Sequence, residues 1–283
     1  MNNSPGLRIG ELQGIPVLLV ESREGRAAIS LFGAQVLSFT PAGFDDLLWL
    51  SPTTTRPPKA IRGGVPICWP WFAKQGVPPE SQQHGIARTA PWTVTRSAID
   101  AAGNVEITLA PNDDAFAAAR VEQTISVGRT LRQVLTTTAM RPYSLTQAFH
   151  TYFRVGDAER IGIEGLDGLT YLDKPSNFSQ QVQTEKFRLD GECDRIYLDT
   201  QGDFAIHDPV LSRRIRIRAK GSRALVVWNP NAEKIKTFTD IPPDGWRSYF
   251  CLEVANAGTD VVTLAPGESH RIEQVLSVEA ISG

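Results

Sequence analysis

One histidine and one glutamate lie inside apolar stretches of this chain, where ionisable side chains are uncommon. His150 lies in AFHTYF, and strand alternation would place it on the same face as Tyr152. Glu253 lies in YFCLEVAN, where a carboxylate must be paired, face a cleft or end the strand, because burying it alone is costly. A histidine and a glutamate together suit proton transfer at neutral pH. The alternative is structural: a cross-strand histidine, and a glutamate paired with an arginine.

A second candidate region is the segment 60–88, AIRGGVPICWPWFAKQGVPPESQQHGIAR, which has neither helical nor strand periodicity. Its glycines permit positive φ or close backbone approach, and its prolines restrict the chain around them. It ends with polar side chains that include Gln83, His84 and Arg88. Loops of this kind often carry function on a rigid scaffold. The alternative is that Trp69 and its aromatic neighbours only close one end of the fold.

Several function classes are disfavoured by composition and by missing motifs. The net charge is −2, which favours neither nucleic acid nor a membrane surface as a partner. There is no CxxC, HxH or HExxH motif, no EF-hand, no GxGxxG, no P-loop and no GxSxG. The three cysteines are far apart in sequence, and the N-terminus lacks a signal-peptide pattern. We therefore expect a cytoplasmic protein without a bound metal or cofactor.

The elements that must position these residues are mostly short strands. Apolar runs alternate with turn residues about every ten positions, and SRRIRIRAK (212–220) alternates arginine with isoleucine as a half-buried strand does. There is no βαβ alternation, so the pattern predicts an all-β fold, a large antiparallel β-sandwich or barrel, in one domain over 1–283. Short helices are expected at 111–120 and 231–237, and a polar loop at 174–199. His207 and His270 are expected in solvated turn or edge positions.

Six blocks of sequence, in order, resemble the hexose-6-phosphate mutarotases. These are the glucose-6-phosphate 1-epimerases, relatives of aldose 1-epimerase with the galactose-mutarotase-like β-sandwich fold. The resemblance runs from about Gly33 to the C-terminus, with mild departures at Trp69 and Ile86, where phenylalanine is common in the family. The blocks are RGGVPICWPWFA (62–73), HGIAR (84–88), FHTYF (149–153), DRIY (194–197), VVWNP (226–230) and CLEVAN (251–256).

The resemblance implies a role for each matching residue. His150 and Glu253 fall on the family's catalytic pair, and Asp194 on a sugar-binding aspartate. Arg62 and Arg88 fall on positions that grip the substrate and its phosphate. Gln83 lies near them, and His84 belongs to the same pocket wall. The implied ligand is a sugar phosphate, with no cofactor, metal, nucleic acid or membrane, and the implied assembly is a monomer.

The implied reaction is the interconversion of α and β anomers. Ionised Glu253 would take the proton of the anomeric hydroxyl while protonated His150 gives one to the ring oxygen, and reclosure on the other face yields the other anomer. Either residue could serve as acid or base, since both transfers reverse on closure. The alternatives are a mutarotase for unphosphorylated aldoses and a carbohydrate-binding or metabolite-sensing sandwich without turnover. Arg62 could also pair with a structural carboxylate instead of phosphate.

Overall fold

The computed structural model describes residues 6–281, and it is built almost entirely from strands. The helical segments are short and lie between strands: α1 (Asn231–Lys234), η1 (Ala87–Thr89), η2 (Asp114–Phe116), η3 (Ile235–Thr237) and η4 (Gly245–Ser248). The strands, in chain order, are β1 (Leu7–Leu12), β2 (Ile15–Glu21), β3 (Gly25–Ser30), β4 (Gln35–Pro41), β5 (Ile67–Cys68), β6 (Trp92–Ile99), β7 (Val105–Pro111), β8 (Ala119–Val127), β9 (Leu131–Ala139), β10 (Tyr143–Leu145), β11 (Gln147–Phe149), β12 (Tyr152–Arg154), β13 (Gly162–Glu164), β14 (Thr170–Asp173), β15 (Ser179–Val182), β16 (Cys193–Leu198), β17 (Asp203–Asp208), β18 (Arg213–Lys220), β19 (Ala224–Asn229), β20 (Tyr249–Asn256), β21 (Val262–Leu264) and β22 (Ser269–Ala280).

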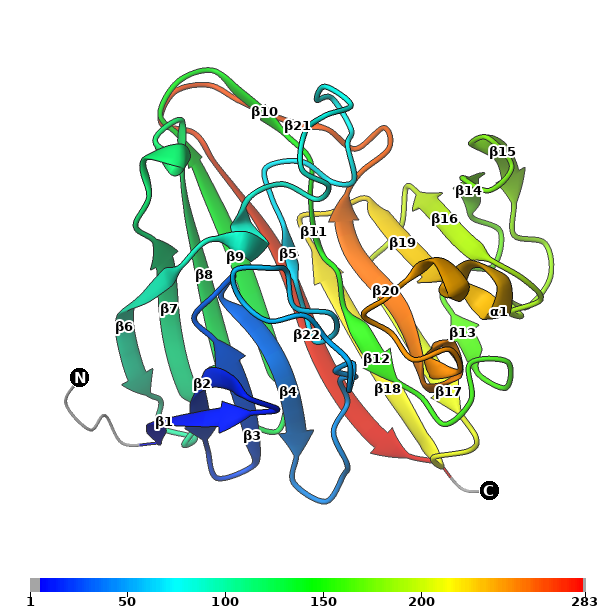
Figure 1. Cartoon of the computed structure of the whole chain (residues 1–283), viewed down its shortest axis with the longest axis horizontal. Coiled ribbons are helices and arrows are strands. Elements are labelled where there is room, and N and C mark those ends of the chain that lie inside the picture. The colour runs from blue at the N-terminus through cyan, green and yellow to red at the C-terminus, as the bar shows by residue number, and fades with distance from the viewer. Residues whose placement is uncertain (1–5, 282–283) are drawn as a thin grey trace.

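Most of these strands form two layers, and β10 and β21 pair as a separate two-stranded sheet. The rear layer in Figure 1 is one eight-stranded sheet in the order β13-β17-β18-β22-β9-β8-β7-β6. The front layer holds the four-stranded sheet β1-β2-β3-β4 and a second eight-stranded sheet in the order β15-β14-β16-β19-β20-β11-β5, with β12 also pairing to β20. A bridge between Val36 and Val65 connects the two front sheets. The predicted all-β sandwich is therefore confirmed.

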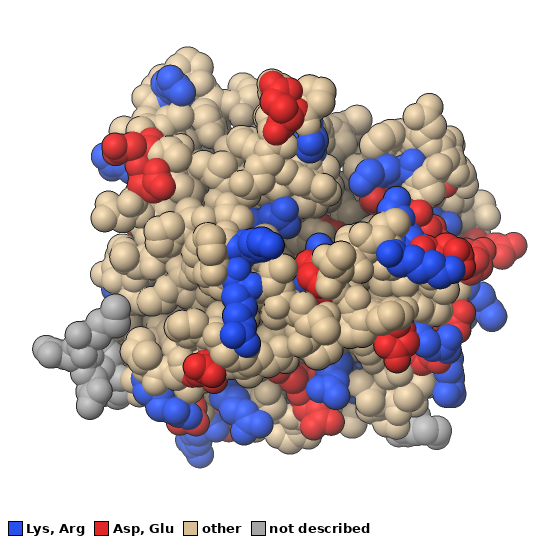
Figure 2. Space-filling view, in the orientation of Figure 1, with Lys and Arg blue, Asp and Glu red and all other residues tan. Residues whose placement is uncertain are grey.

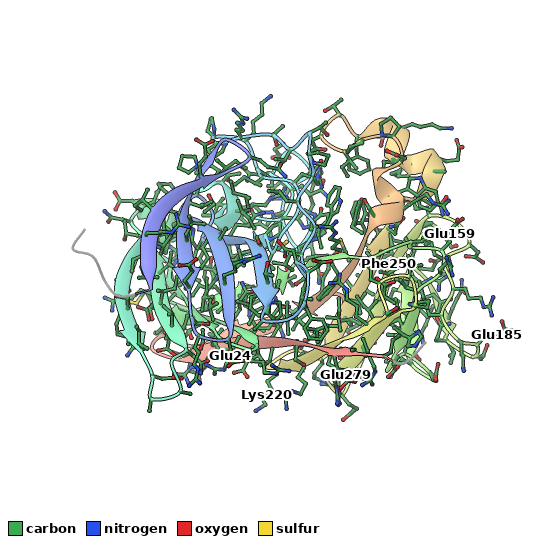
Figure 3. All side chains as sticks on the ribbon, turned by 90° about the horizontal axis from the view of Figure 1, so that it is seen from below. Glu24, Glu159, Glu185, Lys220, Phe250 and Glu279 are labelled. Carbon is green, nitrogen blue, oxygen red and sulfur yellow. The ribbon has the colours of Figure 1, made fainter. Side chains whose placement is uncertain are left out.

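Alternation of buried and exposed residues explains why the layers stack. In β18 the side chains of Ile215 and Ile217 are buried, whereas Arg214, Arg216 and Arg218 lie on the outer face. Figure 3 shows the same division: Lys220 of β18 and Glu279 of β22 project from the outer face of the rear sheet, and Phe250 lies within the molecule. Each buried Val, Leu or Ile contributes roughly 1.5–3 kcal/mol.

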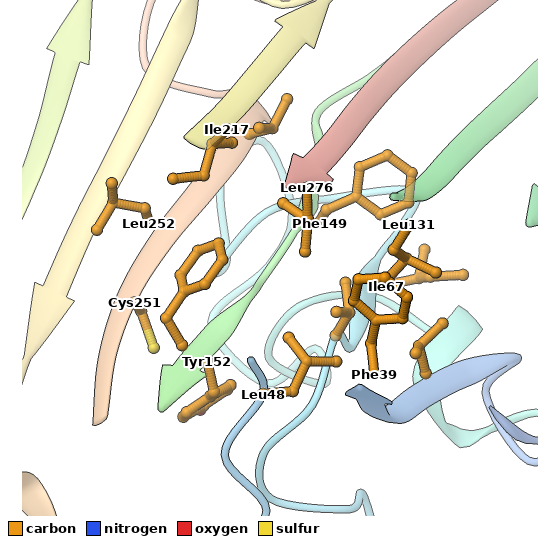
Figure 4. Packing of buried hydrophobic residues seen from close by; sticks show 14 of the residues in the cluster. Phe39, Leu48, Ile67, Leu131, Phe149, Tyr152, Ile217, Cys251, Leu252 and Leu276 are labelled. Atoms are coloured by element: carbon orange, nitrogen blue, oxygen red, sulfur yellow. The ribbon is translucent and has the colours of Figure 1, made fainter. Parts of the chain in front are cut away.

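The main core lies between the layers. Figure 4 shows side chains that converge from β4, β5 and β11 in front and from β9, β18 and β22 behind: Phe39, Ile67, Phe149, Leu131, Ile217 and Leu276. This one cluster draws residues from most of the chain. It supports the single-domain organisation, which stays a prediction.

β20 differs from the other strands because all eight of its residues are buried. Leu252 and Val254 belong to the main core. Ala255 packs on the opposite face, in a smaller apolar cluster with Val226 and Phe72. Since side chains alternate along a strand, Glu253 faces away from the main core, on the side of this smaller cluster. A functional pocket can therefore form on the outside of the front sheet.

Three local predictions were wrong or incomplete. The helix predicted at 111–120 is reduced to the single 3-10 turn η2, because β7 ends at Pro111 and β8 begins at Ala119 and pairs with β9. The polar segment 174–199 contains the edge strand β15 and the strand β16, whose backbone pairings override a hydrophilic composition. His207 lies in β17 instead of a turn, although it is exposed as predicted. His270 lies in β22, where it is half-buried and contacts Asn256. The helical turn at 231–237 is confirmed as α1 and η3.

The segment 60–88 combines both of the roles considered for it. Trp69 is buried, stacks on Phe116 at 5.2 Å and donates its indole N–H to Thr137. The chain then returns so that Gly85 lies against Trp69. At Gly85 φ is +72°, and a Cβ would overlap the carbonyl oxygen of Trp69. One part of the segment therefore closes the core, and the tight return through Gly85 holds His84 at the surface of the front sheet.

Candidate active site

All seven site residues predicted from the sequence line one cavity of about 580 Å³ on the outer side of the front sheet. Figure 2 shows a hollow on this face, with charged side chains of both signs around it. The cavity is bounded by segment 60–88, by β16, β19 and β20, and by α1. The predicted lining residues are Arg62, Gln83, His84, Arg88, His150, Asp194 and Glu253, and the others are Phe72, Lys174, Pro175, Glu192, Val226, Trp228, Lys234 and Phe238.

His150 and Glu253 form the base of this cavity. β11 pairs Phe149 with Val254, so the next position along each strand places His150 beside Glu253. The imidazole Nε2 lies 3.3 Å from the Glu253 carboxylate Oε1. His150 is 7% exposed and Glu253 1% exposed, and neither His150 Nδ1 nor Glu253 Oε2 has a protein partner. The pair therefore has a free proton-carrying position on each side chain, next to a cavity.

Burial sets the protonation of this pair. Together with the nearby cations of Arg62 and Arg88, it lowers the pKa of His150 to about 3. It also raises the pKa of Glu253 well above its ordinary value, and the Asp194 carboxylate adds to that rise. Both shifts favour the neutral side chains. The charge-separated pair expected from the resemblance is thus not the form that burial favours in this pocket.

The low pKa of His150 predicts a pH-dependent stability effect. Between about pH 3 and pH 6.5 the unfolded chain binds a proton at residue 150 that the folded protein does not, so this histidine costs stability as pH falls. Relative to wild type, His150→Gln should gain about 2 kcal/mol in the free energy of unfolding between pH 7 and pH 5. Urea unfolding of both proteins at pH 7, 6 and 5 measures it. A difference that does not change with pH would mean that His150 is readily protonated in the folded state.

His84 is held as a neutral hydrogen-bond donor. Its backbone is in the left-handed region, with φ of 65°. Its Nδ1 accepts from the backbone N–H of Ala73 at 3.2 Å and lies 3.3 Å from the Cys68 sulfur. Burial lowers the pKa of His84 well below its ordinary value, and His150 and Arg88 contribute to that shift. The proton of the neutral ring is then on Nε2, which lies 3.1 Å from the side-chain nitrogen of Gln83. Two donors face each other there, and a flip of the Gln83 amide brings its oxygen to Nε2 as the acceptor.

The two predicted arginines differ in how far they are engaged by the protein. Arg62 donates from Nε to Asp240 at 3.0 Å and from Nη1 to the Tyr152 hydroxyl at 3.0 Å. The pairing of Arg62 with a structural carboxylate is therefore present, although its guanidinium still lines the cavity. Arg88 donates from Nη2 to the Gln83 carbonyl at 2.7 Å, and its buried Nε has no protein partner. Arg88 thus keeps more of its donors for a ligand.

Asp194 lies on β16 and is bound by a residue that sequence reasoning missed. Lys174 Nζ donates to Asp194 Oδ2 at 2.6 Å. Lys174 follows β14 in a stretch interpreted as polar loop, so nothing in its local pattern indicated a pocket. Trp228 was also missed, although it lies in the VVWNP block. Its ring is 5.9 Å from that of His150 and offers an apolar face to the cavity.

A larger hollow than this cavity lies elsewhere on the molecule. A groove of about 800 Å³ is lined by residues of β2, β3 and β4 and by Arg213, and it contains none of the candidate residues. Its charged side chains include Glu21, Arg26 and Asp45, without a paired acid and base. The chemistry of the smaller cavity, rather than its size, makes it the candidate active site.

Residues 6–281 contain neither a cluster of metal ligands nor a membrane-spanning helix. No three His, Cys, Asp or Glu side chains in this range are grouped so that they could hold a metal ion. Over the same range, no helix is long and apolar enough to cross a membrane. The three cysteines, Cys68, Cys193 and Cys251, are buried and unpaired.

Comparison with known proteins connects this site to a family. The family model described as aldose 1-epimerase matches residues 16–277. A protein of Escherichia coli K12 named "putative glucose-6-phosphate 1-epimerase" is 34% identical over 269 residues, covering 90% of this chain and 87% of that protein. A protein of the same name from Cenchrus ciliaris is 32% identical, covering 92% and 84% respectively.

Solved structures agree with the sequence comparison. The crystal structure described as a putative mutarotase (YeaD) from Salmonella typhimurium superposes with a TM-score of 0.90 at 28% identity, covering 99% of this chain and 95% of that one. The match therefore includes all the strands that surround the cavity. The chain belongs to the aldose 1-epimerase family and is an enzyme that interconverts the anomers of an aldose.

Proposed function

We propose that this enzyme interconverts the α and β anomers of an aldohexose 6-phosphate, with glucose 6-phosphate as its substrate. The observation that carries the proposal is the contact between His150 and Glu253 at the base of a cavity with four cationic side chains in its walls, Arg62, Arg88, Lys174 and Lys234. An acid–base pair suits ring opening, and the cations suit a phosphate dianion. The names of the curated relatives agree with this substrate.

His150 and Glu253 supply one donor and one acceptor for ring opening. In the neutral pair that burial favours, the carboxyl of Glu253 carries the proton and the imidazole of His150 accepts one. One group takes the proton of the anomeric hydroxyl while the other protonates the ring oxygen, which opens the ring to the aldehyde. Rotation about the C1–C2 bond and the reverse transfers close the other anomer. Which residue acts first as acid stays a prediction to be tested.

The remaining residues bind and orient the sugar. Trp228 offers an aromatic face on which the apolar side of a pyranose can stack. Asp194 and Gln83 provide acceptors and donors for hydroxyl groups, and His84 provides an Nε2–H donor that burial keeps neutral. Arg88 lines the cavity and has an Nε without a protein partner, so its guanidinium can donate to the phosphate. The cytoplasmic location and the monomeric state stay predictions.

Exchange NMR on freshly dissolved glucose 6-phosphate and glucose tests the proposal. With the protein present, the α and β anomers of the phosphate ester should exchange much faster than in buffer, and those of glucose should exchange little faster. Equal acceleration of both sugars would point to the second candidate, a mutarotase for free aldoses. That candidate has one observation in its favour, the engagement of Arg62 by Asp240. No acceleration of either sugar would contradict both.

A further inference from the structure

Lys174 and Asp194 are connected twice, through the backbone and through their side chains. The Lys174 N–H donates to the Asp194 carbonyl at 3.0 Å, which fixes the start of the lysine stem against β16. The ammonium then reaches Asp194 Oδ2 at 2.6 Å. The Lys174 side chain is 41% exposed, whereas that of Asp194 is 14% exposed. The backbone hydrogen bond therefore fixes the start of the Lys174 side chain, whereas its partly exposed ammonium group can change partner.

The ion pair lies at the junction of two cavities. The candidate active site is on one side, and a second cavity of about 550 Å³ is on the other. Both are lined by Phe72, Gln83, Lys174 and Asp194. The ammonium group thus has open space next to its present position, and a swing about its stem would not require the strands to move.

The other cations of the cavity have partners other than Asp194. Arg62 is held by Asp240, which lies outside the lining, and Lys234 pairs with Glu192 at 3.5 Å near the rim. Arg88 is held by a backbone carbonyl. Lys174 is different because its partner, Asp194, is the carboxylate proposed to bind sugar hydroxyls. A lysine ammonium is also a compact charge with rotatable donors, and so it can change partner more easily than a planar guanidinium.

We propose that Lys174 is a specificity-determining residue that exchanges Asp194 for the phosphate of the substrate. With no phosphate in the pocket, Lys174 occupies the carboxylate of Asp194. When the phosphate takes the ammonium, Asp194 becomes free to accept a hydrogen bond from a sugar hydroxyl. The inference rests on the proposed function, because it assumes a phosphorylated sugar at this site.

This exchange would couple the two ends of the substrate. A free sugar would have to break the ion pair without a replacement for the ammonium, or bind without Asp194. A phosphorylated sugar provides that replacement, so it gains the Asp194 contact in addition to its phosphate contacts. Selectivity would then exceed what the phosphate contacts alone contribute. Burial raises the pKa of Asp194 while Lys174 opposes that rise, which agrees with a carboxylate that depends on a nearby cation for its charge.

Lys174→Met tests the kinetic consequence, because methionine keeps the length of the stem and removes the charge. We expect KM for glucose 6-phosphate to rise about 10–100-fold, the size of one lost charge-assisted hydrogen bond, and kcat/KM for glucose not to fall. Lys236→Met is the matched control, an exposed lysine that pairs with Glu233 outside the cavity, and it should change KM less than about 3-fold. Equal losses on both sugars, no loss on either, or equal effects of the two variants would overturn the proposal.

Binding of inorganic phosphate, followed by ³¹P NMR titration, tests the exchange without turnover. Asp194→Asn releases Lys174, so this variant should bind phosphate several-fold more tightly than wild type. The double variant Asp194→Asn/Lys174→Met should lose that gain. Phosphate affinity that is unchanged by Asp194→Asn would overturn the exchange. If instead the wild-type enzyme shows no preference for the phosphate ester in exchange NMR, the proposed function fails, while the phosphate titration still decides the partner of Lys174.

Discussion

Glu253→Gln should lower kcat for anomer exchange by about 10²–10⁴-fold and leave the fold intact. The amide has nearly the shape of the carboxyl group but can neither give up nor take a proton in this reaction. The free energy of unfolding should not fall, because the substitution replaces a buried carboxyl that has one unpartnered oxygen. Exchange NMR measures the rate, and urea unfolding measures the stability.

His150→Gln should lower kcat by a similar factor, and the double variant little further, because the two groups act as a unit. Glu273→Gln and His270→Gln are matched controls. Glu273 pairs with Arg132 on the rear sheet, and His270 contacts Asn256, so neither lies in the cavity. Wild-type rates in Glu253→Gln or in His150→Gln would remove that residue from the proposed acid–base pair.

Arg88→Met should raise KM for glucose 6-phosphate by about 10–100-fold, since a hydrogen bond to a charged group contributes about 1.5–3 kcal/mol. The value of kcat/KM for glucose should change little, because that sugar carries no phosphate. Arg88 is a sharper probe of phosphate binding than Arg62, because the Nε of Arg88 has no protein partner whereas that of Arg62 donates to Asp240. Arg96→Met, which neutralises an exposed arginine paired with Glu106, is the control and should leave both substrates unaffected. An equal change in KM for both sugars would make Arg88 a structural residue.

Arg62→Met needs a paired variant because Arg62 also neutralises Asp240. The single variant leaves the Asp240 carboxylate without its cation, which should lower stability. Arg62→Met/Asp240→Asn removes both charges and should recover much of that stability. A rise in KM for the phosphate ester that persists in the double variant would assign Arg62 to the substrate as well as to Asp240.

Local pattern was sufficient to predict much of the architecture. Alternating runs such as 212–220 indicated strands, because an antiparallel sheet with one solvated face needs a period of two. His150 and Glu253 stood out for a related reason. An ionisable residue inside an apolar run conflicts with its surroundings, and that conflict is visible without coordinates. The resemblance of six blocks then implied a role for each predicted site residue. The structure places these residues around one cavity.

Tertiary structure alone decided the partners of those residues. Arg62 is engaged by Asp240, 178 positions along the chain, and Asp194 by Lys174 from a segment that appeared to be a loop. The protonation of His150 and Glu253 was also beyond the sequence, because it depends on how completely β11 and β20 are covered. Residue type and spacing report local preference, whereas charge pairing and desolvation depend on distances across the fold. The sequence therefore determined which residues to examine, and packing decided which are charged, paired or free to bind a ligand.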